Sequence, residues 1–150
     1  MCSSSGSVVA TGISTRHLAH AWPDLWPLLK PAYDFSPDKD DLLAGLLARD
    51  FQLFAVYDKS IPVAGIVTKL ILVETTSGDP ELHCHLWLIG GSRVSDWAHD
   101  FITKLIPWAK AEGCRAITGN GRRGWARIVA RFGGVRIEDS QGMPCWRLAV

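Results

Sequence analysis

Residues 81–89 carry three side chains that could move a proton. The residue types in this segment favour a β-strand, and side chains on a strand alternate between its two faces. Glu81, His83 and His85 therefore share one face, and Cys84 lies on the other. An imidazole titrates near pH 6.5, so a histidine here can accept a proton at neutral pH. The three residues are candidate bases. The alternative is two histidines on a partly solvated sheet face.

The two histidines also have the spacing of a metal chelate. A His-x-His pair on a strand can hold zinc, with Cys114 or Cys145 as conceivable further ligands. The sequence contains no second pair of ligand residues at the spacing that zinc sites use. We therefore predict that the protein holds no metal.

Arginines are concentrated near the C-terminal end of the chain. Residues 113–136 include Arg115, Arg122, Arg123, Arg127, Arg131 and Arg136. Arg123, Arg127 and Arg131 recur at a spacing of four, which places them on one face of a helix. Arg122 and Arg123 follow the loop 119–121, where guanidinium groups could hold phosphate oxygens. The alternatives are a solvated helix face, an acidic partner or a nucleic acid backbone. Nucleic acid is the weakest of these, and we expect no nucleic acid partner.

Composition indicates a folded domain of a reducing compartment. The 150 residues carry a net charge of +1, with 47% hydrophobic and 21% charged residues, which excludes disorder. The four cysteines form no Cys-x-x-Cys pair and indicate reduced thiols. Lys69 interrupts the longest apolar run, and residues 1–6 lack the apolar core of a signal peptide. We predict one cytoplasmic domain over residues 1–150, with residues 1–6 flexible and no membrane partner.

Hydrophobic periodicity predicts the elements that must position these residues. The expected strands are residues 8–11, 51–57, 61–74, 81–89, 114–118, 135–138 and 145–150. The expected helices are residues 22–29, 38–49, 95–113 and 125–132. Pro27 and Pro31 should limit the first helix, and a turn is expected at residues 33–37. Ser36 has the residue type of an N-cap for the second helix. Pro107 should kink the third.

The strands between residues 51 and 89 are joined by short turns and predict an antiparallel meander. The helix after them makes the strands on its two sides parallel neighbours, with a right-handed crossover. The crossover contains Arg93-Val94-Ser95-Asp96-Trp97-Ala98. This stretch is similar at both ends to the Q/R-x-x-G-x-G/A loop of the GNAT superfamily of acyl-CoA-dependent N-acyltransferases. The order of elements resembles that superfamily over nearly the full length of the chain.

The resemblance implies an α/β (α+β) fold of one GNAT-like domain. Its sheet would be mixed, mostly antiparallel and splayed between the fourth and fifth strands, with helices on both faces. It also implies acetyl-CoA, or another acyl-CoA, as cosubstrate. The acceptor would be an unidentified amine on a small molecule or a protein.

The resemblance further implies roles for individual residues. The residues implied to bind the coenzyme are Trp87, Leu88, Ile89, Arg93, Ser95, Trp97, Ala98, Asn120, Arg122 and Arg123. In GNAT proteins, backbone amides of the crossover loop and the first helical turn hold the pyrophosphate. The backbone at residues 87–89 would polarise the thioester carbonyl. The base would be His85, His83 or Glu81, and His85 is favoured because it lies closest to the splayed end of its strand.

Two residues depart from the family pattern. Asp96 replaces the central glycine of the loop, and its carboxylate would repel a pyrophosphate. Val129 stands where family members often have a tyrosine that protonates the departing thiolate, and a valine cannot donate a proton. If the protein is an enzyme, another group or a water must protonate the thiolate.

Two short segments are similar to small GNAT-like proteins encoded by tailed bacteriophages, namely residues 121–125 and 22–29. The leading prediction is therefore a phage-type N-acetyltransferase in the cytoplasm of the host cell. The alternative is a GNAT-fold protein without coenzyme activity that serves as a binding or virion-associated phage protein. Its partner would be a phage or host protein.

Overall fold

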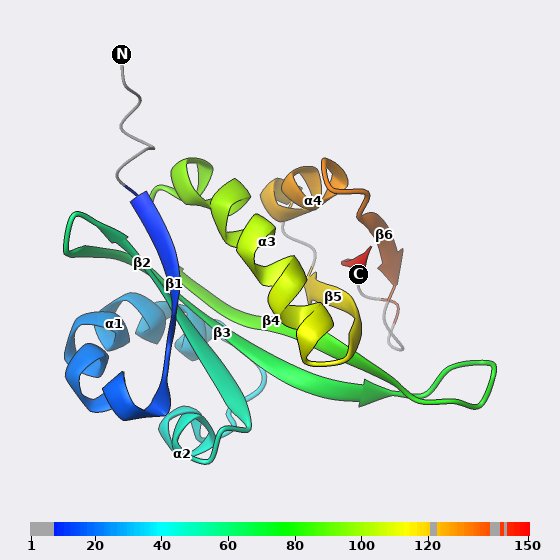
Figure 1. Ribbon diagram of the computed structural model, residues 1–150, viewed down its shortest axis with the longest axis horizontal. Coiled ribbons are helices and arrows are strands. Elements are labelled where there is room, and N and C mark those ends of the chain that lie inside the picture. Colours follow the sequence, from blue (N-terminus) through cyan, green and yellow to red (C-terminus); the bar gives the residue numbers. More distant parts are fainter. Residues whose placement is uncertain (1–7, 121–122, 139–141, 143) are drawn as a thin grey trace. The chain divides into compact units, whose positions relative to one another are not determined.

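The computed structural model describes residues 8–120, 123–138, 142 and 144–150 (Figure 1). In chain order the elements are β1 (Val8–Ile13), α1 (Thr15–Phe35), α2 (Leu42–Leu47), β2 (Phe51–Asp58), β3 (Ile61–Val73), β4 (Glu81–Gly91), α3 (Val94–Ala111), β5 (Cys114–Asn120), α4 (Arg123–Ala130), β6 (Val135–Glu138) and β7 (Pro144–Ala149). This order confirms the one predicted from hydrophobic periodicity. Residues 1–6, predicted to be flexible, lie outside the described residues.

The strands form a seven-stranded sheet in the order β1-β2-β3-β4-β5-β7-β6. The pairs β1–β2, β2–β3, β5–β7 and β6–β7 are antiparallel, whereas β4 and β5 are parallel. The parallel register runs from Leu82 opposite Cys114 to Leu86 opposite Gly119. The mixed, mostly antiparallel sheet that was predicted is therefore confirmed.

The chain divides into two compact units. The first consists of Met1–Lys69 and Leu88–Phe101, and the second of Leu70–Trp87 and Ile102–Val150. Three elements, β3, β4 and α3, begin in one unit and end in the other. That residues 1–150 form a single domain stays a prediction.

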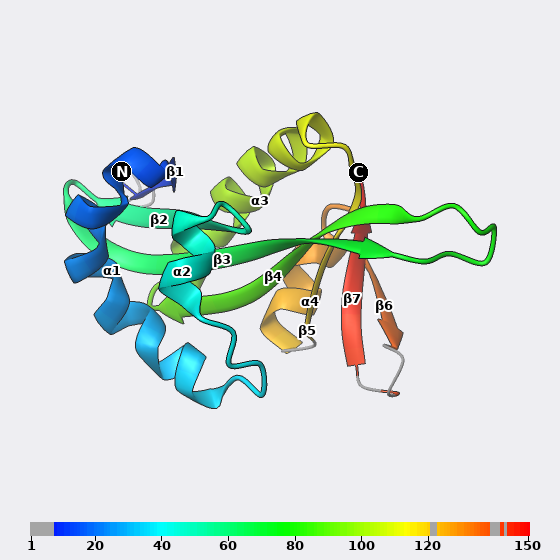
Figure 2. The same cartoon turned by 90° about the horizontal axis from the view of Figure 1, so that it is seen from below.

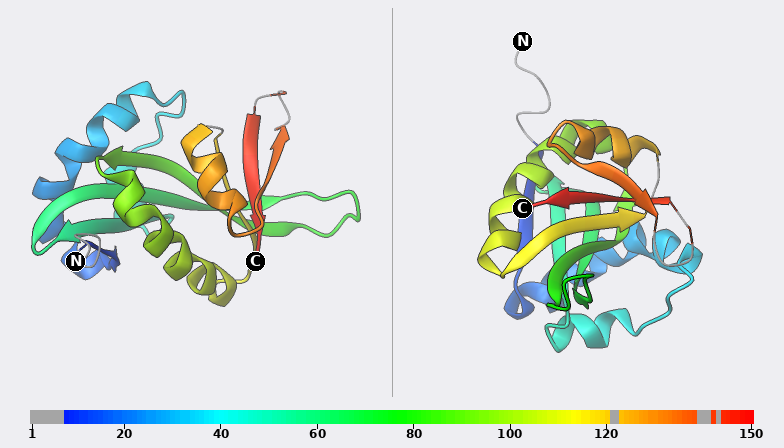
Figure 3. Two further views of the ribbon diagram at one scale, coloured as in Figure 1. Left: turned by 90° about the horizontal axis from the view of Figure 1, so that it is seen from above. Right: turned by 90° about the vertical axis from the view of Figure 1, so that its right-hand side faces the viewer.

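In the first unit, helices pack on both faces of the sheet. Phe54 on β2 meets Phe101 on α3 edge to face, with ring centroids 5.5 Å apart. The next residue on β2, Ala55, pairs with Gly65 on β3, where an added Cβ would lie 3.0 Å from Leu29 on α1. Neighbouring residues on a strand point to opposite faces, so α1 and the start of α3 cover opposite faces. Figures 2 and 3 show these two helices on either side of the strands.

Helix α1 corrects the prediction of a short helix over residues 22–29. It runs from Thr15 to Phe35 and includes Pro23, Pro27 and Pro31, as well as part of the predicted turn at 33–37. A proline inside a helix removes one backbone hydrogen bond and crowds the preceding turn. The three prolines recur at a spacing of four and all lie on the exposed face. The opposite face buries four apolar residues, Leu18, Ala21, Leu25 and Leu29, and this burial offsets the cost of the prolines.

Helix α2 corrects the prediction of a helix that is capped by Ser36 and spans residues 38–49. It begins at Leu42, and the side chain of Asp41 caps it by accepting a hydrogen bond from the Ala44 N–H at 3.1 Å. Ser36 instead ends α1, and its hydroxyl accepts from the Asp38 N–H at 3.2 Å. Serine and aspartate are both favourable caps, so the local sequence did not distinguish the two positions.

In the second unit, burial alternates along β7. Trp146 and Leu148 are buried, whereas Cys145 and Arg147 on the other face are half-exposed. The ring of Trp146 lies so close to Gly119 on β5 that an added Cβ would be 2.4 Å from it. Trp125 and Val129 on α4 are also buried. Arg127 and Arg131 are exposed, as the helical spacing of the arginines predicted.

Candidate functional site

The predicted alternation along β4 is confirmed. Glu81, His83, His85 and Trp87 are half-exposed, whereas Cys84 and Leu86 between them are buried. The three candidate bases therefore lie on one face of the strand, which we call the β4 face. All three belong to the second unit.

Two of the candidate bases are in direct contact. The Nε2 atom of His83 lies 3.2 Å from the Oε1 atom of Glu81, at hydrogen-bonding distance. The guanidinium of Arg147 approaches the same oxygen at 3.5 Å. The hydrogen bond from His83 holds the pKa of Glu81 below its usual range, assisted by the charges of Arg147 and Arg115 against the opposing effect of desolvation. Glu81 is therefore a carboxylate at neutral pH, and it accepts hydrogen bonds rather than donating them.

His85 has a different partner. Its Nδ1 atom lies 3.0 Å from the Oγ1 atom of Thr118 on β5, the residue that pairs with it across the parallel ladder. A hydroxyl can donate or accept, so this contact is compatible with either neutral form of the imidazole. The structure thus brings Glu81 and His83 together and gives His85 a hydroxyl partner that the sequence did not predict.

In the first unit, the crossover loop between β4 and α3 is held in place by hydrogen bonds to backbone carbonyls. The Ser92 N–H donates to the Val63 carbonyl at 3.1 Å, and the Asp96 N–H donates to the Arg93 carbonyl at 2.9 Å. The indole N–H of Trp97 donates to the Ser92 carbonyl at 2.8 Å. Gly91 and Arg93 both have positive φ angles, of 121° and 60°. The loop therefore turns sharply from the strand into the first turn of α3.

Arg93 is held by two carboxylates. Its Nη1 atom donates to Asp58 at 2.6 Å, and its Nε atom donates to Asp96 at 2.9 Å. The hydrogen bonds to Asp58 and Asp96 raise the pKa of the guanidinium further above its usual value. One positive and two negative charges leave this cluster with a net negative charge. The sequence predicted that Asp96 would repel an anion, but it did not indicate that Asp58 on β2 also contacts Arg93.

The other predicted residues of the crossover differ in exposure. Trp97 and Ala98 are buried, at 0% and 2% exposure, so only their backbone could face a ligand. Ser95 is exposed in the first turn of α3, where helical N–H groups lack partners within the helix. Leu88 is buried and Ile89 is half-exposed at the end of β4. Their roles in coenzyme binding stay predictions.

The predicted loop residues after β5 are only partly described. Asn120 is exposed at the end of β5, opposite Cys145 on β7. Arg122 lies outside the described residues. Arg123 begins α4, and its side chain also lies outside the described part of the structure.

The conceivable zinc partners of the histidines are not grouped with them. Cys114 is buried at the start of β5, and its burial, together with the charge of Glu112, raises the pKa of its thiol. Among the described residues, no three His, Cys, Asp or Glu side chains are arranged to hold a metal ion. Within the same residues, no helix has the length and apolar character needed to cross a membrane.

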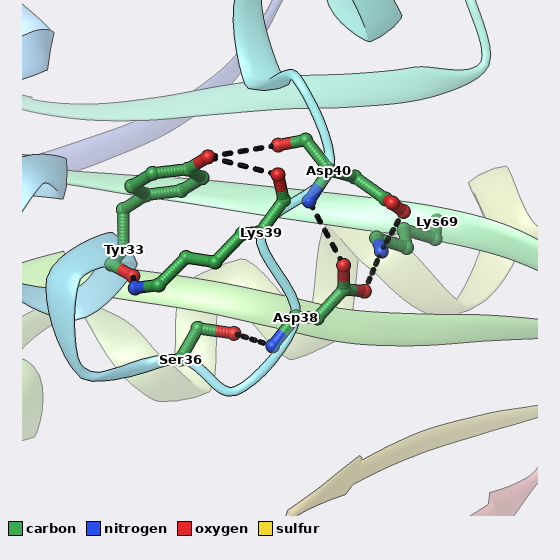
Figure 4. A network of polar contacts seen from close by, with 6 residues as sticks. All are labelled: Tyr33, Ser36, Asp38, Lys39, Asp40 and Lys69. Atoms are coloured by element: carbon green, nitrogen blue, oxygen red, sulfur yellow. Dashed lines mark hydrogen bonds and ion pairs between the residues drawn. The ribbon is translucent and has the colours of Figure 1, made fainter.

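Lys69 forms a polar network that sequence reasoning missed (Figure 4). It lies on β3 with its side chain only 11% exposed, and its ammonium contacts Asp38 and Asp40 and lies 4.9 Å from the centre of the Phe51 ring. The hydroxyl of Tyr33 donates to the carbonyls of Lys39 and Asp40. The network attaches the segment between α1 and α2 to the sheet of the first unit. In the sequence, Lys69 stood out only as a break in an apolar run.

We expect Lys69→Met to make the free energy of unfolding less sensitive to pH in the acid range. Partial burial favours a higher pKa for Asp38, but the hydrogen bond and charge of Lys69 and the Asp40 N–H outweigh it and lower this pKa. A lowered pKa contributes stability above the ordinary value of about 3.9 and loses it as the pH falls through the folded value. The stability difference between wild type and variant should therefore shrink between about pH 6 and about pH 3. Urea denaturation at the two pH values measures it, and an unchanged difference would contradict the assignment.

Comparison with known proteins identifies the fold. No family model and no curated protein matches the sequence. An apo mutant of agmatine N-acetyltransferase is 13% identical with a TM-score of 0.65, covering 96% of this chain and 100% of that chain. The ribosomal-protein-S18-alanine N-acetyltransferase of Escherichia coli is 11% identical with a TM-score of 0.63, covering 95% and 94%.

A third structure contains a cosubstrate. NAA60 of Arabidopsis thaliana in complex with acetyl-CoA is 10% identical with a TM-score of 0.63, and the match covers 95% of this chain and 97% of that chain. Identities this low show the fold alone. From its order of elements, its sheet and these neighbours, the chain has the GNAT acetyltransferase fold.

Proposed function

We propose that this protein is an acyl-CoA-dependent N-acyltransferase that transfers an acetyl group, or another acyl group, to an amine not yet identified. The observation that carries the proposal is the hydrogen-bonded pair of Glu81 and His83 on the β4 face of a GNAT fold. An amine must lose a proton when it is acylated, and an imidazole beside a carboxylate is suited to accept it. The phage origin and the cytoplasmic location predicted from the sequence remain part of this proposal.

The proposed reaction is a direct transfer. The amine nitrogen attacks the thioester carbonyl carbon, a C–N bond forms and the C–S bond breaks. The proton that the nitrogen loses goes to an imidazole of the β4 face. Backbone N–H groups of Trp87, Leu88 and Ile89 would polarise the carbonyl. Val129 is buried and has no proton to donate, so water would protonate the thiolate.

The coenzyme phosphates would meet the first turn of α3. Helical N–H groups at Ser95 and its neighbours attract anions through their partial positive charge. Arg93 could add a full charge only if it left Asp58 or Asp96, to which it is bound here. This competition favours the second candidate function, a GNAT-fold protein without coenzyme activity that binds a phage or host protein in the cell or the virion.

Calorimetric titration with acetyl-CoA distinguishes the two functions. We expect the wild type to bind in the micromolar range, and Asp96→Gly to bind about tenfold more tightly, because it removes a negative charge from the cluster and one of the two carboxylates that hold Arg93. Asp79→Gly is a matched control on an exposed turn and should leave the affinity unchanged.

Absence of binding at millimolar acetyl-CoA would contradict the proposed transferase activity and favour the second candidate, a binding protein without coenzyme activity. Equal affinities of wild type and Asp96→Gly would show that the carboxylate does not oppose the ligand. Acceptors can then be sought with primary amines of the kinds that two of the structural neighbours are named for, namely agmatine and a peptide that begins with alanine. Transfer is detected as free thiol released from acetyl-CoA.

A further inference from the structure

The side chain of Arg147 crosses a strand to reach Glu81. Arg147 lies on β7 and Glu81 on β4, and β5 lies between these strands in the sheet. Adjacent strands are about 4.8 Å apart, so the two backbones are separated by about 10 Å. The guanidinium nevertheless lies 3.5 Å from the Glu81 carboxylate. Arg147 therefore extends over the face of β5, with its side chain 33% exposed.

The residue type on β5 permits this crossing. Thr118 pairs with Arg147, and Ala116 pairs with Ala149, so Ala116 and Thr118 lie on the same face of the sheet as Arg147. Ala116 is fully buried on that face although its side chain is a single methyl group. A larger side chain here would occupy the space that the guanidinium needs. The small residue and the long cation are thus complementary.

The crossing bears on the position of the Glu81 carboxylate in its pair with His83. Glu81 is ionised at neutral pH with or without Arg147, and a carboxylate only accepts hydrogen bonds. The contact with Arg147 holds this carboxylate on the β4 face beside His83. His83 must then donate its Nε2–H to Glu81, and in the neutral imidazole the lone pair is left on Nδ1. The His83 side chain is 12% exposed, so solvent competes little with this contact. By contrast, the hydroxyl beside His85 fixes neither form.

We propose that Arg147 is a positioning residue that acts through Glu81, and that it keeps His83 with Nδ1 unprotonated as the base that takes the proton of the acceptor amine. The inference rests on the proposed function and replaces His85 by His83 as the favoured base. The charged and titratable groups that act on Glu81, the partner of His83, are His83 itself on β4, Arg115 on β5 and Arg147 on β7.

Nitrogen-15 NMR of the histidine rings tests the inference without coenzyme or acceptor. Long-range proton–nitrogen spectra distinguish Nδ1 from Nε2, and the His83→Gln variant assigns the His83 signals. At neutral pH we expect the form protonated on Nε2 to exceed the other neutral form by about tenfold or more, because hydrogen bonds to charged groups are strong. A wild-type His83 protonated on Nδ1 would overturn the proposal.

Variants of Arg147 test whether this residue positions Glu81. Arg147→Met keeps most of the stem but removes the charge, so the pKa of Glu81 should rise towards its usual range. Glu81 stays ionised at neutral pH, but its carboxylate is no longer held beside His83, so the tautomer ratio should fall. The Glu81 pKa is followed by carbon-13 NMR of its carboxyl group. Arg147→Lys should restore both values in part, and Arg131→Met, on an exposed position after α4, should change neither.

Unchanged Glu81 and His83 signals in Arg147→Met would refute the positioning role. Failure of the proposed function is a separate result, since it shows as absence of acetyl-CoA binding in the titration while the NMR measurements still report on the pair. If the protein binds acetyl-CoA and His83 is protonated on Nδ1, the proposed function is retained. The proposal that Arg147 acts through Glu81 to make His83 the base is then rejected.

Discussion

Gly90→Ala should lower the free energy of unfolding by about 3 kcal/mol or more. A Cβ at residue 90 would lie 2.0 Å from the carbonyl oxygen of Leu28, 2.8 Å from its carbonyl carbon and 3.0 Å from the Cα of Leu29. These are backbone atoms of α1, which cannot rotate away as a flexible side chain would. The substitution must therefore separate the end of β4 from α1 in the first unit, where Leu25 and Leu29 are fully buried.

Urea denaturation followed by tryptophan fluorescence measures the loss. Gly124→Ala is the matched control, because an added Cβ there meets no atom within 4 Å and alanine is the better helix former. It should be neutral or stabilise by up to about 1 kcal/mol. Gly78→Ala is a second control, which distinguishes backbone strain from steric overlap. Its φ of +89° is unfavourable for alanine, but no atom lies within 4 Å of the added Cβ. A Gly90→Ala protein within about 0.5 kcal/mol of wild type would contradict the close packing of α1.

Most of the fold could be predicted because it follows from local patterns. From residue 51 onwards, the period of the apolar residues changes within a few residues of the places where the structure changes element. Glycine and turn residues mark the ends of β2, β3 and α3 within a few residues. The parallel pairing of β4 and β5 followed from the single helix between them.

The first two helices could not be predicted from local rules, because tertiary contacts outweigh these rules. A proline costs roughly 3 kcal/mol in a helix interior, which argues for ending α1 early. Burial of residues such as Leu25 and Leu29 against the sheet supplies the compensating free energy, and it depends on residues far along the chain. Asp38 shows the same effect, since it was assigned to the first turn of a helix and instead pairs with Lys69 on β3.

The same distinction between local patterns and contacts of distant segments applies to the candidate site. That Glu81, His83 and His85 share a face follows from alternation along one strand and was predictable. Which of them are paired was not, because Arg147 and Thr118 reach the β4 face from β7 and β5. Asp58, which competes for Arg93, comes from β2 in the same way. Contacts between distant segments carry no signal in a single sequence, and here they determine which groups are free to react.

His83→Gln should reduce turnover by about 10²- to 10³-fold with little change in the affinity for acetyl-CoA. Glutamine keeps a side-chain N–H that can donate to Glu81, but its amide cannot take a proton from the acceptor. The variant therefore preserves the Glu81 contact and removes only proton transfer. The measurement is the rate of thiol release from acetyl-CoA with the best amine of the acceptor panel, at saturating concentrations of both substrates.

His85→Gln is the matched comparison, because it makes the same change two residues further along the same face. Its partner Thr118 can hydrogen-bond to an amide as well as to an imidazole, so we expect a loss of less than about tenfold. The opposite order, with the larger loss in His85→Gln, would make His85 the base, as the position of that residue on the strand first suggested. Equal and small losses in both variants would mean that the proton leaves through water, and the two imidazoles would then only shape the surface on which the amine binds.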